Sequence, residues 1–259
     1  MTQRMTQALI VSDFADGNGG QAKVAIDTAR LLADAGVAVH FFAATGVISP
    51  LLDRPGITVT CLGQYTLLDN PSRARAMVSG LWNITAARAL AQAVSALDPD
   101  HAVVLCHGWA KALSPSVGRV LAASRAPVLY TMHEYFLACP NGGFFDYRAN
   151  QICTRTPLSV DCCFTNCDAR HAAHKAWRLT RSLLARGPGR LPRGLQHIAY
   201  ISETQRRAMT PYLPADAQVY HLPNPVAALG ERVDAAKNHK FVFVGRLSRE
   251  KGGVIFAEA

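Results

Sequence analysis

The sequence predicts an α/β fold in which a Rossmann-like parallel sheet carries helices on both faces. Short apolar strands alternate with helical segments from the N-terminus onwards. These strands are continuous apolar runs, as expected for strands that are buried on both faces. The chain has 259 residues, of which 49% are hydrophobic, so it is long enough to bury a substantial core.

The first half of the chain supplies five predicted strands with helices between them. The first helix opens after Gly19-Gly20 and repeats its apolar residues at helical spacing. A long helical stretch covers roughly Ser72 to Leu97, and Asp98-Pro99-Asp100 ends it because proline cannot continue a helix. The predicted strands are residues 8–12, 37–42, 57–62, 103–106 and 127–131.

Residues 1–225 are interpreted as one Rossmann-like domain with two additions. A cysteine-rich insertion occupies about 136–168, and a basic helix follows at about 169–186. Two further strands are predicted near residues 198–202 and 219–222. These additions fall between the fifth and sixth strands, where a crossover connection is expected.

The C-terminal residues indicate a second unit. Residues 226–239 are polar and irregular, which is typical of a linker. A strand at Phe241–Val244 and a helix starting near Lys251 cannot bury their apolar faces alone. Residues 240–259 are therefore predicted to begin a second, truncated α/β domain. The alternative is a strand and helix that dock on the first domain.

Hydropathy and charge limit the location and partners of the protein. No apolar run reaches the roughly 18 residues of a membrane-spanning helix, and the N-terminal apolar stretch is too short for a secretion signal, so a cytoplasmic location is expected. The net charge is +9, and the segment between Asp168 and Gly194 supplies +6 of it, as seven Lys and Arg against one Asp. Such clustering indicates an anionic partner, or simply a solvated helix face.

A helical wheel divides the basic segment into two faces. The basic residues of the helix fall within one arc: Arg170, His171, His174, Lys175, Arg178 and Arg181. The opposite arc holds Ala172, Ala173, Ala176, Trp177, Thr180, Leu183 and Leu184. A helix of this kind could bind peripherally to the anionic inner face of the membrane. Alternatively, its apolar side packs on the sheet and the cations face solvent.

Five of the seven cysteines lie close together in the sequence: Cys139, Cys153, Cys162, Cys163 and Cys167. In a reducing compartment such a cluster indicates a metal site or plain thiols rather than disulfides. Four thiolates could close a tetrahedral structural site, so a structural Zn²⁺ on Cys139, Cys153, Cys162 and Cys167 is one prediction. Reduced, unligated thiols are the alternative.

The candidate site residues of the first domain follow strand ends. Ligands of open parallel sheets bind at the carboxyl ends of the strands. Gly19-Gly20 opens the first helix, whose N-terminus favours an anionic group. His133 and Glu134 follow the fifth strand, and His107 follows the fourth. An imidazole at this position could donate to a substrate hydroxyl or to a departing phosphate, and either histidine could fill that role.

A second candidate site follows the strand at residues 241–244. Arg246 offers a planar fork of donors and Lys251 a point charge, and together they suit a diphosphate, although a surface pair of cations is the alternative. The dinucleotide fingerprint G-x-G-x-x-G is not matched at residues 16–22, which lack its third glycine. This mismatch weighs against a nicotinamide-binding enzyme.

Six segments, in order along the chain, resemble retaining GT-B glycosyltransferases of family 4. They are Gly19-Gly20, Leu97–Asp100, Thr131–Glu134, Tyr200–Glu203, Leu222–Pro225 and Phe241–Gly253. The loop from Cys139 to Asp168 is similar to a cysteine-bearing subgroup of that family. The resemblance implies two Rossmann-like domains facing each other across a cleft, the first binding the acceptor and the second a nucleotide-sugar.

The resemblance also implies roles for single residues. Arg246 and Lys251 would hold the donor diphosphate, Gly20 would approach it, and His133 would be catalytic, near the reacting sugar. On the acceptor side the predicted residues are Gly19, His107 and Glu134. The leaving phosphate would help to deprotonate the acceptor on the same face, so that the anomeric configuration is retained. No metal cofactor is expected for catalysis, because the cations neutralise the diphosphate.

The predicted activity is transfer of a sugar from a nucleotide-sugar to a polysaccharide, a lipid-linked acceptor or another glycan, with no nucleic-acid partner. The acidic donor motif of the family lies beyond residue 259, so this chain alone is expected to have little activity. One alternative is an inactive module that only binds the acceptor. The other, from a different class, is an NAD-dependent sugar epimerase or reductase.

Overall fold

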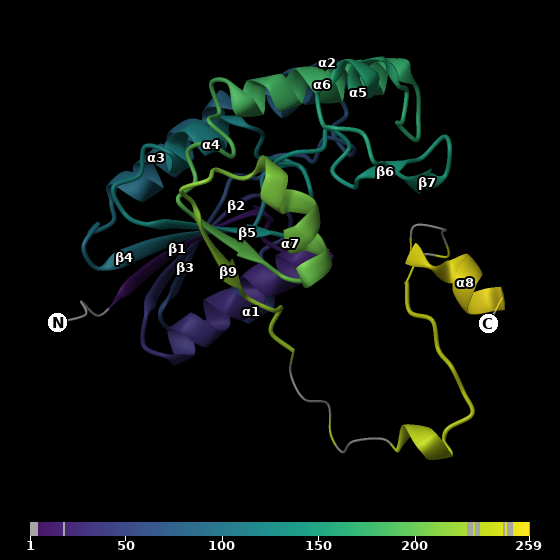
Figure 1. Cartoon of the computed structure of the whole chain (residues 1–259). Helices are drawn as coiled ribbons and strands as arrows, with labels where there is room; N and C mark the ends of the chain where they lie inside the picture. The colour runs from purple at the N-terminus through teal and green to yellow at the C-terminus, as the bar shows by residue number, and fades with distance from the viewer. Residues whose placement is uncertain are drawn as a thin grey trace.

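The computed structural model describes residues 5–17, 19–226, 230, 234–245, 247 and 251–258. At its centre is a seven-stranded sheet in the order β3-β2-β1-β4-β5-β8-β9, in which every neighbouring pair is parallel (Figure 1). The strands are β1 (Gln7–Phe14), β2 (Ala38–Thr45), β3 (Ile57–Cys61), β4 (Ala102–Cys106), β5 (Val128–Met132), β8 (His197–Tyr200) and β9 (Gln218–His221). The predicted α/β fold is confirmed.

Helices cover both faces of this sheet. On one face, α1 (Gly20–Asp34) packs Ile26 against Ile10 and Phe41 of β1 and β2. On the other face, the core continues into α3 (Ile84–Ser95) and α4 (Ser116–Leu121). The other helices are α2 (Arg73–Leu81), α5 (Val160–Phe164), α6 (Ala172–Arg186), α7 (Glu203–Met209) and α8 (Gly253–Glu258). A small antiparallel pair, β6 (Phe145–Asp146) and β7 (Gln151–Ile152), lies in the cysteine-rich insertion.

The central strand explains why the strands read as continuous apolar runs. Leu9 and Val11 of β1 point into the core shared with α3 and α4, whereas Ala8 and Ile10 point towards α1. Each of these side chains is at most 1% exposed. Burial of a side chain such as Leu9 or Ile10 contributes roughly 1.5–3 kcal/mol. Both faces of the strand therefore need apolar residues.

The helical stretch predicted from Ser72 to Leu97 is wrong as one helix, because it is divided into α2 and α3. Asn83 makes the division. Its Oδ1 accepts a hydrogen bond from the N–H of Ala86 at 3.0 Å, which caps the start of α3. Its Nδ2 donates to the carbonyl of Ala112 at 3.1 Å. The cap thus ties the start of α3 to the loop that follows β4.

The strand predicted at Phe241–Val244 is not formed. A strand requires the backbone hydrogen bonds of a neighbouring strand. None of the described residues pairs with this segment, and Phe241, Val242 and Val244 are exposed. The short helix predicted after Lys251 is present as α8, which lies apart from the sheet in Figure 1.

The predicted basic helix is present as α6, but its orientation is the reverse of either expectation. Lys175 and Arg181, on its cationic arc, are buried against the protein, whereas Leu183 on the apolar arc is 60% exposed. Arg178 forms an ion pair with the buried Asp168, with 2.8 Å between Nε and Oδ2. The cations face inward because the insertion and the loop after β4 supply acceptors for them. Arg186, for example, donates to the carbonyl of Ala138 at 3.4 Å.

Candidate active site at the carboxyl edge of the sheet

The sheet has a topological switch point between β1 and β4. Strands β2 and β3 extend the sheet on one side of β1, and β4, β5, β8 and β9 extend it on the other. The crevice outside the carboxyl ends of the strands at such a point is the usual ligand site of open α/β sheets. Gly19 and Gly20 follow β1, His107 follows β4 directly, and His133 follows β5 directly. The site residues that the sequence predicts for the first domain therefore lie at this edge of the sheet.

His107 and His133 contact each other at the ends of β4 and β5. Nδ1 of His107 lies 3.0 Å from Nε2 of His133, a hydrogen-bond distance, and the rings are stacked with 5.3 Å between their centroids. His107 is only 4% exposed. Its Nε2 is buried and has no hydrogen-bond partner among the described residues. The two histidines that the sequence offered as competitors thus form a pair.

Burial keeps this pair uncharged at neutral pH. Loss of hydration, with a smaller contribution from the charge of His133, lowers the pKa of His107 to about 3. Burial lowers the pKa of His133 to about 4. Each ring therefore carries one N–H and one unprotonated nitrogen near pH 7.

Asp13, near the end of β1, fixes the loop that follows His107. Its carboxylate accepts hydrogen bonds from the backbone N–H groups of Lys111, Ala112 and Leu113 at 3.1, 2.8 and 2.9 Å. Burial raises the pKa of Asp13, and the three N–H groups oppose that rise. The sequence interpretation missed this role. An acidic residue near the end of a buried strand was the available signal.

Arg181 of α6 reaches the same loop from the other side. It is 4% exposed, and its Nη1 donates to the carbonyl of Ala110 at 2.9 Å. Its guanidinium lies over the rings of Trp109, Phe136 and Trp177 at 5.5, 4.9 and 4.9 Å from their centroids. Burial lowers the pKa of Arg181 to about 10, while the carboxylates of Asp13 and Glu134 favour its charged form.

Glu134 is placed at the predicted edge but is engaged within the protein. Its Oε1 lies 3.1 Å from Nζ of Lys111, and both side chains are partly exposed. The pair links the loop after β4 to the loop after β5. An acceptor-binding role for Glu134 would therefore be shared with Lys111, which the sequence did not single out.

The N-terminus of α1, which follows β1, also lies at this carboxyl edge of the sheet. Gly19 has φ 90° and ψ 165°, a conformation that favours glycine, whereas a Cβ built on Gly19 or Gly20 would meet no atom within 4 Å. No acidic side chain lies in the first turn of α1 and no side chain caps it, within the described residues. Gln21 reaches across to the loop after β4, since a Cβ on Gly108 would lie 1.5 Å from its Nε2.

Of the predicted donor-diphosphate residues, Gly20 lies at this edge, at the start of α1. Arg246 lies outside the described residues. Lys251 is exposed and directly precedes Gly252 and α8, the helix that lies apart from the sheet (Figure 1).

The four cysteines predicted to hold zinc are not arranged as a metal site. No group of three or more His, Cys, Asp or Glu within the described ranges could hold a metal ion. Instead, Nζ of Lys175 lies 3.1 Å from Sγ of Cys167 and 3.6 Å from Sγ of Cys162. Cys153 contacts Arg155, with 3.7 Å between Sγ and Nη1, and Cys139 is a buried free thiol. Lys175 and Arg155 lie beside three of these sulfurs, so the four cysteines do not fit a closed four-thiolate zinc site.

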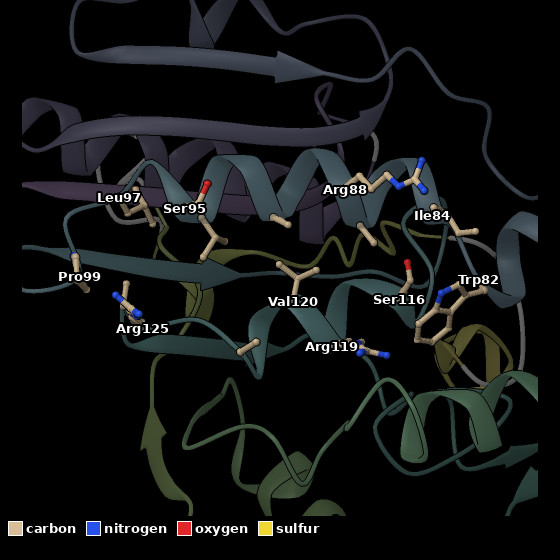
Figure 2. Close-up of a pocket in the computed structure, with 15 residues that line it drawn as sticks. Trp82, Ile84, Arg88, Ser95, Leu97, Pro99, Ser116, Arg119, Val120 and Arg125 are labelled. Atoms are coloured by element: carbon tan, nitrogen blue, oxygen red, sulfur yellow. The ribbon is translucent and has the colours of Figure 1, made fainter.

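A groove of about 970 Å³ lies between α3 and α4 (Figure 2). Its walls are mostly apolar, with Arg88, Arg119 and Arg125 among them. None of the predicted site residues lines it. The predicted site residues of the first domain therefore lie outside this groove.

A comparison with known families decides the assignment of the chain. The glycosyl transferase 4-like domain matches residues 19–225, which is most of the chain. The chain belongs to this family. The histidine pair and the α1 N-terminus thus lie within a glycosyl transferase 4-like domain. No curated protein matches the chain.

Solved glycosyltransferase structures show weaker likenesses to this glycosyl transferase 4-like chain. A UDP-glucosyltransferase from Polygonum tinctorium is 17% identical, with a TM-score of 0.49, and the match covers 91% of this chain and 57% of that one. UGT71G1 from Medicago truncatula, complexed with UDP-glucose, is 11% identical with a TM-score of 0.49, covering 84% and 51%. The chain therefore spans about half the length of the solved structures that it matches.

No helix among the described residues is both long and apolar enough to cross a membrane.

Proposed function

We propose that this chain is the acceptor-side domain of a glycosyltransferase that moves a sugar from a nucleotide-sugar to an acceptor hydroxyl, with retention of configuration. The observation that carries the proposal is the neutral His107–His133 pair at the ends of β4 and β5, beside the switch point of a glycosyl transferase 4-like domain. An uncharged imidazole at this position can bond to a sugar hydroxyl or a phosphate oxygen without competing with the donor cations for the diphosphate.

The site residues have separate roles in this proposal. His133 is the catalytic residue that contacts the reacting sugar or its phosphate. The first turn of α1, opened by Gly19 and Gly20, directs backbone N–H groups at the donor phosphate or the acceptor. The Lys111–Glu134 pair borders the acceptor. Lys251, with Arg246 outside the described residues, would neutralise the donor diphosphate from the second unit.

The acceptor that we propose is a polysaccharide or lipid-linked glycan at the cytoplasmic face of the membrane. The inward orientation of α6 changes how membrane contact would work, because Arg178 and Arg181 are engaged with the protein. An electrostatic contact would have to use the exposed cations around α6, which are Arg170, Arg190 and Arg193. Zinc has no part in the proposed chemistry.

The test is transfer and binding with a panel of nucleotide-sugars. Transfer to water or to a glycan acceptor is read by mass spectrometry, and binding is read by ligand-observed NMR. His133→Asn should reduce turnover more than donor binding. The matched control is His101→Asn, since His101 precedes β4 at the opposite end of the sheet and is exposed.

Two outcomes would replace the proposal. If glycan acceptors bind but no nucleotide-sugar is turned over even when the chain is joined to a complete donor-binding domain, the chain is an acceptor-binding module. If a nicotinamide cofactor binds in a titration and nucleotide-sugars are oxidised or epimerised, the chain belongs instead to an NAD-dependent reductase or epimerase. Equal turnover by the His133→Asn and His101→Asn variants would remove His133 from the chemistry.

A further inference from the structure

We propose that His107 is a positioning residue that fixes His133 as a neutral hydrogen-bond donor, with the proton of His133 on Nδ1. This inference rests on the proposed function only for the ligand, a sugar or phosphate oxygen. The pairing itself follows from the geometry of the two rings.

The contact between the rings decides which nitrogen of His133 faces a ligand. Nε2 of His133 is occupied by Nδ1 of His107 at 3.0 Å. Nδ1 of His133 has no hydrogen-bond partner among the described residues. Since the rings are stacked with an interplanar angle of 23° and His107 is buried, the ring of His133 is held in this orientation. Nδ1 is therefore its one free nitrogen.

The proton between the two nitrogens can come from either ring, and the buried end of His107 separates the cases. If His133 donated, His107 would carry its proton on Nε2, a buried nitrogen that has no partner in the described part of the chain. In native proteins a buried N–H without an acceptor is rarer than a buried acceptor without a donor. If His107 donates from Nδ1, its buried Nε2 holds only a lone pair. The second arrangement is favoured, and it leaves the proton of His133 on Nδ1.

The consequence for the chemistry is that His133 donates and does not accept a proton. A donor at this position would stabilise negative charge on the departing phosphate or orient a sugar hydroxyl. The groups around the pair carry balanced charge, since Lys111 pairs with Glu134, and Arg181 lies near Asp13. Removal of the acceptor proton would then fall to the leaving phosphate itself.

The first experiment measures the tautomers directly. Two-bond ¹⁵N–¹H correlation spectra of the whole chain, labelled at histidine, are expected to show the Nδ1–H form for both His107 and His133 at pH 7. The Nε2–H form of His133 in the native chain would overturn the proposal. Because this readout needs no substrate, it stays informative if no transferase activity is found.

Variants of His107 separate positioning from packing. His107→Asn keeps an N–H near the position of Nδ1, so His133 should stay in the Nδ1–H form. His107→Leu removes the donor, so His133 should move to a mixture of tautomers.

With an active enzyme, His107→Leu should lower kcat by up to about 10²-fold, the order for one lost oriented donor, with little change in KM. His107→Asn should restore most of that loss. An unchanged tautomer of His133 in His107→Leu would also overturn the proposal, and if that variant does not fold, the native and His107→Asn spectra decide.

Discussion

The carboxyl edge of the sheet and the inner face of α6 both bury polar side chains, but they differ in how those side chains are paired. On α6, the buried or partly buried cations reach acceptors within the protein, such as Asp168 for Arg178 and Ala110 for Arg181. At the edge, Nε2 of His107 is buried without a partner, and Nδ1 of His133 is left free among the described residues.

An unpaired buried atom also occurs beside α6 among the described residues, Oδ1 of Asn141, so the comparison concerns the cations of α6 and the two histidines. Buried polar groups in native proteins are nearly always hydrogen-bonded, so an unpaired one needs a reason. The α6 cations hold the insertion and the loop after β4 in place and have little capacity left for a ligand. The histidine pair retains unused capacity where a ligand of this fold would bind.

The largest effect expected from a single substitution tests the scaffold side of the comparison. Arg178→Ala would leave the carboxylate of Asp168, which is 1% exposed, without its ion-pair partner. The expected loss is about 3 kcal/mol of unfolding free energy, because an uncompensated buried charge is costly. Urea denaturation followed by circular dichroism measures it.

The matched control for this change is Arg170→Ala, on the exposed start of the same basic segment. The side chain of Arg170 is exposed, so its removal should change the unfolding free energy by no more than about 0.5 kcal/mol. Equal losses in the two variants would show that the cations of α6 act through net charge and not through specific pairs.

The orientation of α6 was beyond sequence reasoning for a physical reason. Periodicity identifies two faces of a helix but not the neighbour of each face. The acceptors of its cations come from distant segments, such as Ala110 and Ala138, and no local pattern announces them. The sequence did predict the parallel sheet and the neighbouring ends of β4 and β5, because both follow from strand and helix alternation.

The site was predictable in its location but not in its internal contacts. His107, His133 and Gly19 could be placed at one edge because carboxyl ends of parallel strands meet there. The stacking of the two imidazoles depends on side-chain rotamers, and the role of Asp13 depends on the path of the loop after β4. The zinc prediction rested on cysteine spacing alone and could not foresee that Lys175 would lie between two of the sulfurs.

A second prediction concerns the pH dependence of stability, which tests the site side of the comparison. The folded pKa values of His107 and His133, about 3 and about 4, lie below the usual value of 6.5. The unfolded chain therefore binds more protons than the folded chain between pH 6.5 and about 4. Stability is fully present above pH 6.5 and should fall as the pH drops through this window, by up to about 1.4 kcal/mol per pH unit for each histidine.

Urea titrations at a series of pH values measure this slope. The double variant His107→Asn, His133→Asn should flatten the curve between pH 6.5 and 4, whereas His101→Asn, at the exposed end of β4, should leave it steep. A slope that persists in the double variant would assign the acid sensitivity to other groups and would place the histidine pair closer to solvent.

The smallest expected effects separate structure from function within the edge itself, at two adjacent glycines. Gly19 has φ 90°, so Gly19→Ala is strained and should cost about 1–2 kcal/mol of unfolding free energy. Gly20 is the first residue of α1 and faces open space, so Gly20→Ala should change stability by no more than about 0.5 kcal/mol.

If a ligand approaches the backbone here, the methyl group of Gly20→Ala should weaken nucleotide-sugar or acceptor binding while the protein stays as stable as before. Denaturation and ligand-observed NMR on the same two variants measure both effects. Unchanged binding in a fully stable Gly20→Ala variant would mean that the α1 N-terminus serves the fold alone and that the site is confined to the loops after β4 and β5.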